Sequence, residues 1–307
     1  MKVLVTGGAG FIGSHSVEAL LASDAEVIVY DNFSTGKREN LPQDSRLTVI
    51  EGDIRDEAAM RQAVAGMSHI LHLAASVSVG VSVENPTTSA GHNITGFLNM
   101  LDAARRAGVT RVVYASSAAV YGMPKSLPLT EESSVAPISP YGLEKSVNDQ
   151  YAKMFGNLYG VRSLGMRYFN VYGPRQDAAS PYAGVISKFT HRMSRDEPVH
   201  VFGDGRQTRD FIFVEDVANY NVRALRRDCD GVCNVGSGIS VTLLQLIDEL
   251  AKCYGKKADV KFDPAVAGDI RHSAMTPGRL HRELGAVRAT ELAAGLSTLC
   301  KSCGQSR

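Results

Sequence analysis

The 307-residue sequence lacks a charge excess, because 33 lysines and arginines face 32 aspartates and glutamates. A formal net charge of +1 provides no broad field to attract nucleic acid or an anionic membrane. A negatively charged ligand must therefore be held by a few local groups. No apolar run approaches the ~18 residues of a membrane span, and no charged segment precedes such a run near Met1. We expect a protein that is neither secreted nor embedded in a membrane.

Cysteine is scarce, and its pattern is equally restrictive. The five thiols are odd in number and lack the spacing of a disulfide framework. They favour a reducing compartment, so we predict a cytoplasmic protein. Cys300 and Cys303 form one CxxC pair, but half of a ligand set is a weak indication of zinc. We predict a pair of thiols in the C-terminal tail and no metal site.

Short apolar runs alternate with helically spaced segments through the first part of the chain. This alternation predicts βαβ units, a parallel sheet and, with right-handed crossovers, a doubly wound arrangement. The alternation loosens after Tyr172, and we expect loops with short elements over 172–209. We predict an α/β fold with a Rossmann-type domain over 1–172 and a smaller substrate-binding domain over 173–307, from which some segments return to the first. The predicted strands are 2–6, 26–30, 47–51, 69–73 and 111–115, and the predicted helices are 12–21, 58–65, 93–107 and 242–254.

Three glycines follow the first predicted strand and open the first predicted helix. Gly7, Gly10 and Gly13 permit a tight turn, close approach of the backbone to a pyrophosphate, and close packing of the helix on the strand. The motif could be a tight turn alone, but it lies in the strand–loop–helix context that a dinucleotide site requires. We therefore predict that these glycines bind the phosphates of a dinucleotide.

Asp31 ends the second predicted strand. A carboxylate at this point can bind both hydroxyls of the adenosine ribose and would repel a 2′-phosphate. It predicts NAD rather than NADP, although Lys37 and Arg38 could attract a 2′-phosphate. The alternative interpretation is that Asp31 only begins a turn.

A YxxxK pair follows Pro140, which can begin a helix and so place Tyr141 and Lys145 on one face. A phenol has a pKa near ~10, which a nearby ammonium and a cationic nicotinamide would lower. Tyr141 would then serve as a base near neutral pH. We predict Tyr141 and Lys145 as the catalytic pair, with Ser117 or its neighbour Ser116 supplying a hydroxyl. The alternative is an ordinary surface pair.

Together these motifs resemble the extended short-chain dehydrogenase/reductase family over almost the whole chain. Within that family the sequence is most similar to the UDP-glucose and UDP-N-acetylglucosamine 4-epimerases. The resemblance implies NAD as the cofactor of the first domain, a UDP-sugar bound mainly by the second, and a homodimer formed through a helix bundle. The segments that carry it include TGGAGFIGSH, YDNFSTGK, SPYGLEK, RYFNVYGPRQ and GDGRQTRDFIFVEDV.

The resemblance also implies roles for individual residues. Asn170 and Arg209 would bind the UDP diphosphate, and Phe202 would lie by the uracil. Guanidinium suits phosphate, although Arg209 could instead form a structural salt bridge with Asp210 or Asp216. Cofactor contacts are implied for Phe11, Ile12, Asn32, Ser34, Gly36, Asp53, Ile54, Leu73, Ala74, Ala75, Asn93 and Tyr168, and substrate contacts for Ser117, Asn170, Phe202, Arg209 and Ser273.

Two positions bear on the reaction itself. Ala118 and Ala119 stand where the dehydratases of the family need an acidic pair, so dehydration is not expected. Epimerisation at C4 needs only the tyrosine, the lysine, a hydroxyl and NAD. We expect Tyr141 to remove the O4 proton while C4 gives hydride to NAD, and the hydride to return to the other face of a 4-keto sugar. The alternatives are a UDP-glucuronate 4-epimerase, another nucleotide-sugar-modifying enzyme of the family, and a non-catalytic dinucleotide sensor.

Two further positions bear on the substrate. Val266 stands where the epimerases carry an arginine for the diphosphate, and Arg206 or Arg271 could replace it. Ser273 ends the segment 268–273, which resembles the epimerase segment beside the C2 substituent of the sugar. Epimerases restricted to plain glucose and galactose can carry tyrosine there, whereas those that accept acetamido sugars carry a small residue. Serine predicts UDP-GlcNAc and UDP-GalNAc as substrates, with UDP-Glc and UDP-Gal as further ones. The alternative is an ordinary polar residue on a strand edge.

Overall fold

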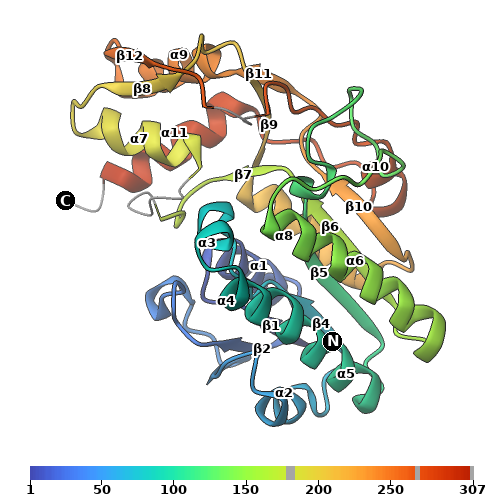
Figure 1. The fold of residues 1–307 in the computed structure, drawn as a ribbon. Helices are drawn as coiled ribbons and strands as arrows, with labels where there is room; N and C mark the ends of the chain where they lie inside the picture. Colours follow the sequence, from blue (N-terminus) through green and yellow to red (C-terminus); the bar gives the residue numbers. More distant parts are fainter. Residues whose placement is uncertain (178–183, 267–269, 305–307) are drawn as a thin grey trace.

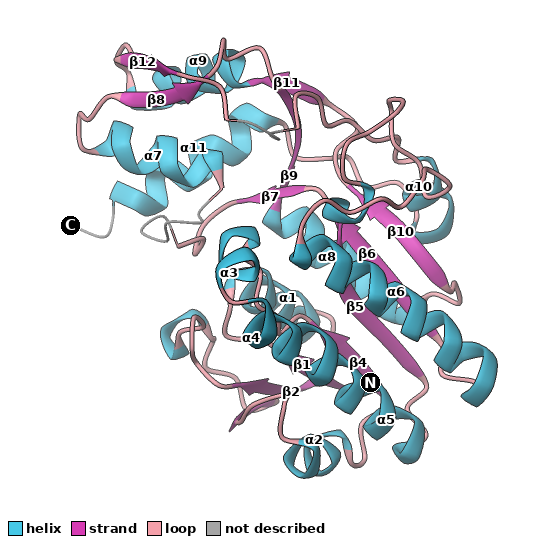
Figure 2. Ribbon diagram, viewed as in Figure 1, coloured by secondary structure: helices cyan, strands magenta, loops and turns pink. Residues whose placement is uncertain are grey.

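The computed structural model describes residues 1–177, 184–266 and 270–304 (Figure 1). Its largest feature is a sheet of seven parallel strands (Figure 2). The strands are β1 (Lys2–Thr6), β2 (Glu26–Asp31), β3 (Leu47–Glu51), β4 (His69–His72), β5 (Arg111–Ser117), β6 (Ser163–Tyr168) and β10 (Gly231–Val235). Their order is β10-β6-β5-β4-β1-β2-β3, so the direction of winding reverses between β1 and β4. The predicted doubly wound fold is confirmed, and ligands bind such sheets at the carboxyl ends beside this reversal.

Helices cover both faces of the sheet and enclose two apolar cores. Successive side chains of a strand point to opposite faces, so Val3 and Val5 of β1 enter one core and Leu4 enters the other. On the Val3 side lie α1 (Phe11–Ala22) and α8 (Val214–Arg226), and on the Leu4 side lie α2 (Glu57–Val64), α5 (Gly96–Ala107) and α6 (Pro140–Tyr159).

A smaller body lies beyond the carboxyl ends of the strands, at the top of Figure 1. The short elements expected over 172–209 include an amphipathic helix and a strand, which pack into a separate apolar core. Conversely, α8 and β10 return to the large sheet. The domain boundary at residue 172 stays a prediction. The elements of the smaller body are α7 (Val185–Ser194), β8 (Val199–Phe202), α9 (Leu243–Tyr254), β12 (Val260–Asp263) and α11 (Leu292–Gly304).

The C-terminal thiols are part of this body. Cys300 and Cys303 lie on the C-terminal helix α11 and pack, with Cys253, against the apolar core of this body. Within the described ranges, no helix is long and apolar enough to cross a membrane. The remaining elements are α3 (Val79–Glu84), α4 (Pro86–Ala90), a π-helical turn (Gly91–Thr95), β7 (Asn170–Tyr172), β9 (Thr208–Phe213), β11 (Ser240–Thr242), α10 (Gly278–Leu284) and two short 3-10 helices (Arg38–Asn40 and Ala118–Tyr121).

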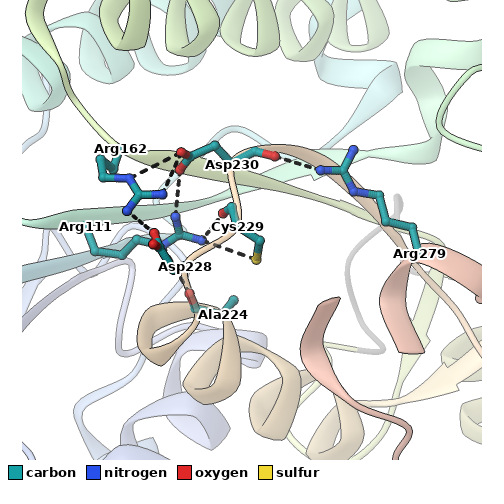
Figure 3. Close-up of polar contacts among 7 residues, drawn as sticks. All are labelled: Arg111, Arg162, Ala224, Asp228, Cys229, Asp230 and Arg279. Carbon is teal, nitrogen blue, oxygen red and sulfur yellow. Dashed lines mark hydrogen bonds and ion pairs between the residues drawn. The ribbon is translucent and has the colours of Figure 1, made fainter. Parts of the chain in front are cut away.

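Charged side chains form a cluster at the amino ends of β5, β6 and β10 (Figure 3). Arg111 is buried, and its Nη1 donates to Asp230 Oδ1 at 2.8 Å while its Nε donates to Ala224 O at 3.1 Å. The half-exposed Arg162 forms ion pairs with Asp228 and Asp230. This cluster joins three strands to the end of α8, at the edge of the sheet opposite the carboxyl ends.

Candidate active site

The loop after β1 brings bare backbone to the carboxyl edge of the sheet. Gly7 has a φ of +70°, and a Cβ on it would lie 2.6 Å from Ala74 N. A Cβ on Gly13 would lie 2.1 Å from Gly7 O, so neither position admits a side chain. Gly10, the N-cap of α1, provides no side-chain acceptor for the amides of the first turn. Bare backbone and free helix amides together fit the pyrophosphate of a dinucleotide.

The carboxylate of Asp31 lies beside this loop and is buried. Its Oδ2 accepts from Ala9 N at 3.0 Å and its Oδ1 from Phe33 N at 2.8 Å. A carboxylate has about four acceptor positions, so it keeps capacity for two ribose hydroxyls. Gly36 closes against it, since a Cβ there would lie 3.0 Å from Asp31 Oδ2. The predicted ribose contact fits this geometry.

The two cations that could attract a 2′-phosphate already have carboxylate partners. Arg38 Nη2 lies 2.8 Å from Glu51 Oε2, and its guanidinium lies over the ring of Phe33. Lys37 Nζ lies 3.7 Å from Glu39 Oε1. These pairs weaken the case for NADP.

The other expected adenosine contacts form one cluster beside the end of β2. Asn32 Nδ2 donates to Asp53 Oδ2 at 3.2 Å, and Ser34 N donates to Asn32 Oδ1 at 3.1 Å. Hydrogen bonds from Arg55 hold the pKa of Asp53 well below its usual range, so this carboxylate stays charged. Of the remaining expected contacts, Phe11 and Ile12 lie in the first turn of α1, Ile54 is buried after Asp53, and Leu73, Ala74 and Ala75 follow β4.

Tyr141 lies in the first turn of α6, which Ser139 caps by accepting from Gly142 N at 3.1 Å. Burial raises the pKa of Tyr141 to about 12, and a hydrogen bond with the hydroxyl of Ser117 opposes this rise. Ser117 ends β5. Ser116 instead lies buried beside Asp149. Of the two serines considered, the structure therefore brings Ser117 to Tyr141.

Lys145 lies one helical turn further along and is only 3% exposed. Its Nζ donates to Ala115 O at 2.9 Å and lies 5.8 Å from the centre of the Tyr141 ring. Burial lowers the pKa of Lys145 to about 8, while Asp149 and Glu144 act in the opposite direction. An ammonium close to the phenol stabilises the phenolate.

Two of the expected cofactor residues have their side chains engaged within the protein. Asn93 Nδ2 donates to Ser76 O at 2.9 Å and to Glu144 Oε2 at 2.6 Å, so both of its donors are used. Tyr168 donates to Asn221 Oδ1 at 2.7 Å, which directs its side chain into the layer of α1 and α8. Asn93 therefore links segments around the site, and the hydroxyl of Tyr168 has Asn221 as its partner.

The expected diphosphate and uracil residues lie on the strands that lead to the smaller body. Asn170 begins β7 and its Nδ2 donates to Asp210 O at 2.8 Å. Arg209 on β9 donates to Thr208 O at 2.9 Å. Phe202 ends β8 with half of its surface exposed. The pairing of β7 with β9 keeps Asn170 and Arg209 on neighbouring strands.

Ser273 is held against β9 through its backbone, because its N–H donates to Thr208 O at 3.1 Å. It therefore lies beside the strand that carries Arg209. Val266 is exposed, and Arg271 is in an ion pair with Asp204 at 2.7 Å. Residues 267–269 of the segments named above lie outside the described residues.

Residues 3–236 match the model of the NAD dependent epimerase/dehydratase family. The chain belongs to this family. It is 37% identical over 304 residues to the UDP-glucose 4-epimerase of Mycolicibacterium smegmatis, covering 97% of this chain and 96% of the relative. The resemblance to extended short-chain dehydrogenases/reductases is thereby confirmed.

Two solved structures are similar over the whole chain. The UDP-N-acetylglucosamine 4-epimerase of Methanobrevibacter ruminantium, in complex with UDP-N-acetylmuramic acid, is 37% identical with a TM-score of 0.96, covering 100% of this chain and 99% of that chain. The UDP-glucose 4-epimerase of Thermus thermophilus, in complex with NAD, is 37% identical with a TM-score of 0.92, covering 100% of both. NAD as the cofactor is confirmed.

Three polar groups near Tyr141 were not predicted from the sequence. Ser82 Oγ accepts from Tyr141 N at 3.1 Å, Glu144 is buried, and Asp149 is in an ion pair with Arg167 at 3.0 Å. Glu144 and Asp149 lie three and eight residues after Tyr141 on α6, but their burial and their partners depend on segments elsewhere in the chain.

Proposed function

We propose that the protein is an NAD-dependent UDP-sugar 4-epimerase. The observation that carries this proposal is the meeting of Ser117, Tyr141 and Lys145 at the carboxyl edge of the sheet, close to the cradle for a dinucleotide. Ala118 and Ala119 follow Ser117 directly, so these two positions provide no acid for dehydration. The named activities of the relatives support the same reaction.

Each of these residues has a separate role in the reaction. NAD, when bound, supplies oxidation and reduction at C4 of the sugar. Tyr141 takes the proton from O4 and later returns it, and Ser117 orients O4 through its hydroxyl. Lys145 stabilises the phenolate with its positive charge. The glycine loop holds the pyrophosphate and Asp31 the adenosine ribose.

For the sugar itself, we propose UDP-GlcNAc and UDP-GalNAc, with UDP-Glc and UDP-Gal as further substrates. Support comes from Ser273, whose backbone is held beside the strand of Arg209 and whose side chain is smaller than that of tyrosine. One structural neighbour carries the name of a UDP-N-acetylglucosamine 4-epimerase and another that of a UDP-glucose 4-epimerase.

The first test is incubation of the NAD-loaded protein with UDP-GlcNAc, UDP-Glc and UDP-glucuronate separately, with products resolved by NMR. We expect C4 epimers of the first two. Conversion of UDP-glucuronate alone would favour the glucuronate alternative, and no conversion of any sugar would overturn the proposal in favour of a non-catalytic dinucleotide sensor.

The second test is Ser273→Tyr, with Ser273→Ala as the matched control. A tyrosine ring would overlap an acetamido group, and overpacking of this kind costs about 1–3 kcal/mol. We expect activity on UDP-GlcNAc to fall roughly 5- to 150-fold while activity on UDP-Glc persists, and Ser273→Ala to keep both. A parallel loss on both sugars would show that Ser273 does not select the substrate.

We also propose a homodimer through α6. Leu143, Met154 and Leu158 are each more than half exposed, and their spacing places them on one face of this helix. An apolar face of this kind is typical of a subunit interface. Light scattering of the wild type and of Met154→Glu tests it, since a charged residue in the interface should yield monomers. The cytoplasmic location stays a prediction.

A further inference from the structure

A carboxylate is buried within the helix that carries the catalytic pair. Glu144 lies between Tyr141 and Lys145 on α6 and is only 4% exposed. Among the described residues, no cationic nitrogen lies within ion-pair distance of its oxygens. A buried carboxylate is costly unless it is hydrogen-bonded or paired, so this group requires specific donors.

Two neutral donors meet on one oxygen of this carboxylate. Ser89 Oγ, from α4, donates to Glu144 Oε2 at 2.9 Å. Asn93 Nδ2, from the π-helical turn, donates to the same oxygen at 2.6 Å. Hydrogen bonds to a charged acceptor are stronger than those between neutral groups. Glu144 thus links α6 to the segment that follows β4 through two neutral donors.

Asn93 extends this link towards the cofactor loop. Its Oδ1 accepts from Ser76 N at 2.8 Å and its Nδ2 donates to Ser76 O at 2.9 Å. Ser76 lies two residues beyond Ala74, the residue that packs against Gly7 in the glycine cradle. One chain of contacts therefore runs from the helix of Tyr141 to the wall of the dinucleotide site.

We propose that Glu144 is a positioning residue for the catalytic pair, which aligns α6 with the cofactor loop through Ser89 and Asn93 and imposes its negative charge on Tyr141 and Lys145. This inference rests on the proposed epimerase function.

The surroundings of Tyr141 support the electrostatic part. Burial raises the pKa of the phenol, the Ser117 hydroxyl on β5 lowers it, and Glu144 raises it further. Glu144 therefore opposes ionisation of Tyr141.

The neighbouring carboxylates also change the pKa of Lys145. Asp149 and Glu144, both on α6, raise the pKa of Lys145 against the effect of burial. Asp149 forms an ion pair with Arg167 on β6. On β4, burial lowers the pKa of His72 to about 3, so this ring is neutral near Lys145. Glu144 is thus the carboxylate near Lys145 whose hydrogen bonds come only from neutral donors.

The test is Glu144→Gln, which keeps the shape and an acceptor oxygen but removes the charge. Without the charge, the pKa values of both Tyr141 and Lys145 should fall. Both limbs of the pH profile of kcat/KM should then move to lower pH, by about half to one unit for the loss of one nearby charge in a protein interior. Ser89→Ala, which removes one hydrogen bond and keeps the charge, should leave both limbs in place.

A second readout does not depend on turnover. Phenolate absorbance is titrated in the protein with and without Tyr141→Phe, in the wild-type and Glu144→Gln backgrounds, and the differences isolate Tyr141. We expect its titration at lower pH in Glu144→Gln. Unchanged titration and unchanged limbs in an active, folded Glu144→Gln protein would overturn the inference. An inactive wild type would instead overturn the proposed function.

The positioning part is tested by Glu144→Asp. This variant keeps the charge but is too short to reach both donors. We expect kcat to fall about tenfold while both pH limbs stay within the wild-type range. Full activity would overturn the positioning role, and this variant provides the answer even if Glu144→Gln does not fold.

Discussion

Charged side chains gather at both ends of the central sheet, and their partners differ between the two ends. At the amino end, Arg111 meets the carboxylate of Asp230 and backbone carbonyls, and Arg162 meets two aspartates (Figure 3). At the carboxyl end, the oxygen of Glu144 meets a hydroxyl and an amide, and Lys145 meets one backbone carbonyl. The arginines at the amino end are paired with aspartates, whereas Glu144 and Lys145 at the carboxyl end have neutral hydrogen-bond partners and lie beside the buried Asp149–Arg167 ion pair.

This difference reflects what each end does. Removal of one partner of a buried ion pair is destabilising, because the other charge is then left buried without a partner. Tyr141 and Lys145 have shifted pKa values, which is typical of catalytic sites. Burial raises the pKa of Tyr141 to about 12 and lowers that of Lys145 to about 8, so both groups are held away from their ordinary ionisation. We therefore expect mutations at the carboxyl end to affect catalysis and those at the amino end to affect stability.

The largest effect is expected for Tyr141→Phe. Loss of a positioned acid/base hydroxyl costs about 10²–10⁴ in rate, while removal of one partly buried hydroxyl should change the free energy of unfolding by less than about 1 kcal/mol. Steady-state assays with UDP-Glc and urea unfolding measure both quantities. Activity within tenfold of the wild type would show that another group is the base.

Arg111→Met should show the opposite pattern. It leaves the carbonyls of Ala224 and Cys229 without their donor and removes one partner of Asp230. We expect a loss of about 2–3 kcal/mol in the free energy of unfolding, with kcat per folded molecule unchanged. A kcat that fell as far as in Tyr141→Phe would contradict the division of roles between the two ends.

A third change separates cofactor binding from chemistry. Asp31→Ala removes the acceptor for the ribose, and a hydrogen bond to a charged group contributes about 1.5–3 kcal/mol. We expect NAD to bind roughly 10- to 150-fold more weakly, with less discrimination against NADP, by fluorescence titration. Asp31→Asn keeps the shape and indicates how much is due to charge. Equal affinity of the wild type for both cofactors would refute the role of Asp31.

The local motifs of the site could be predicted from the sequence, because each depends on neighbours in the chain. The glycine loop, Asp31 and the Tyr141–Lys145 pair all lie at strand or helix ends that periodicity reveals. The strands β6 and β10 of the large sheet could not be found in this way. Position 165 in β6 requires glycine, because a Cβ there would lie 2.5 Å from the Tyr114 hydroxyl oxygen. Arg167 in the same strand is buried, and its charge is compensated by the ion pair with Asp149.

The burial of Glu144 was equally hidden from the sequence. Its donors, Ser89 and Asn93, lie 55 and 51 residues earlier in the chain. A glutamate next to a lysine in a helix is commonly solvated, and nothing local distinguishes this one. Long-range contacts of this kind decide which charges are preserved, and only the assembled fold reveals them.

The smallest effect is expected for Arg162→Gln, which sharpens the comparison within the amino end itself. Arg162 shares Asp230 with Arg111, but its side chain is 44% exposed, against 5% for Arg111. Exposed ion pairs contribute about 0–1 kcal/mol because water screens the charges and the long side chain loses freedom. We expect less than about 1 kcal/mol in urea unfolding, and less still at high salt. A loss as large as that of Arg111→Met would mean that the cluster stabilises the sheet as one charged network, and that burial of Arg111 is not the deciding factor.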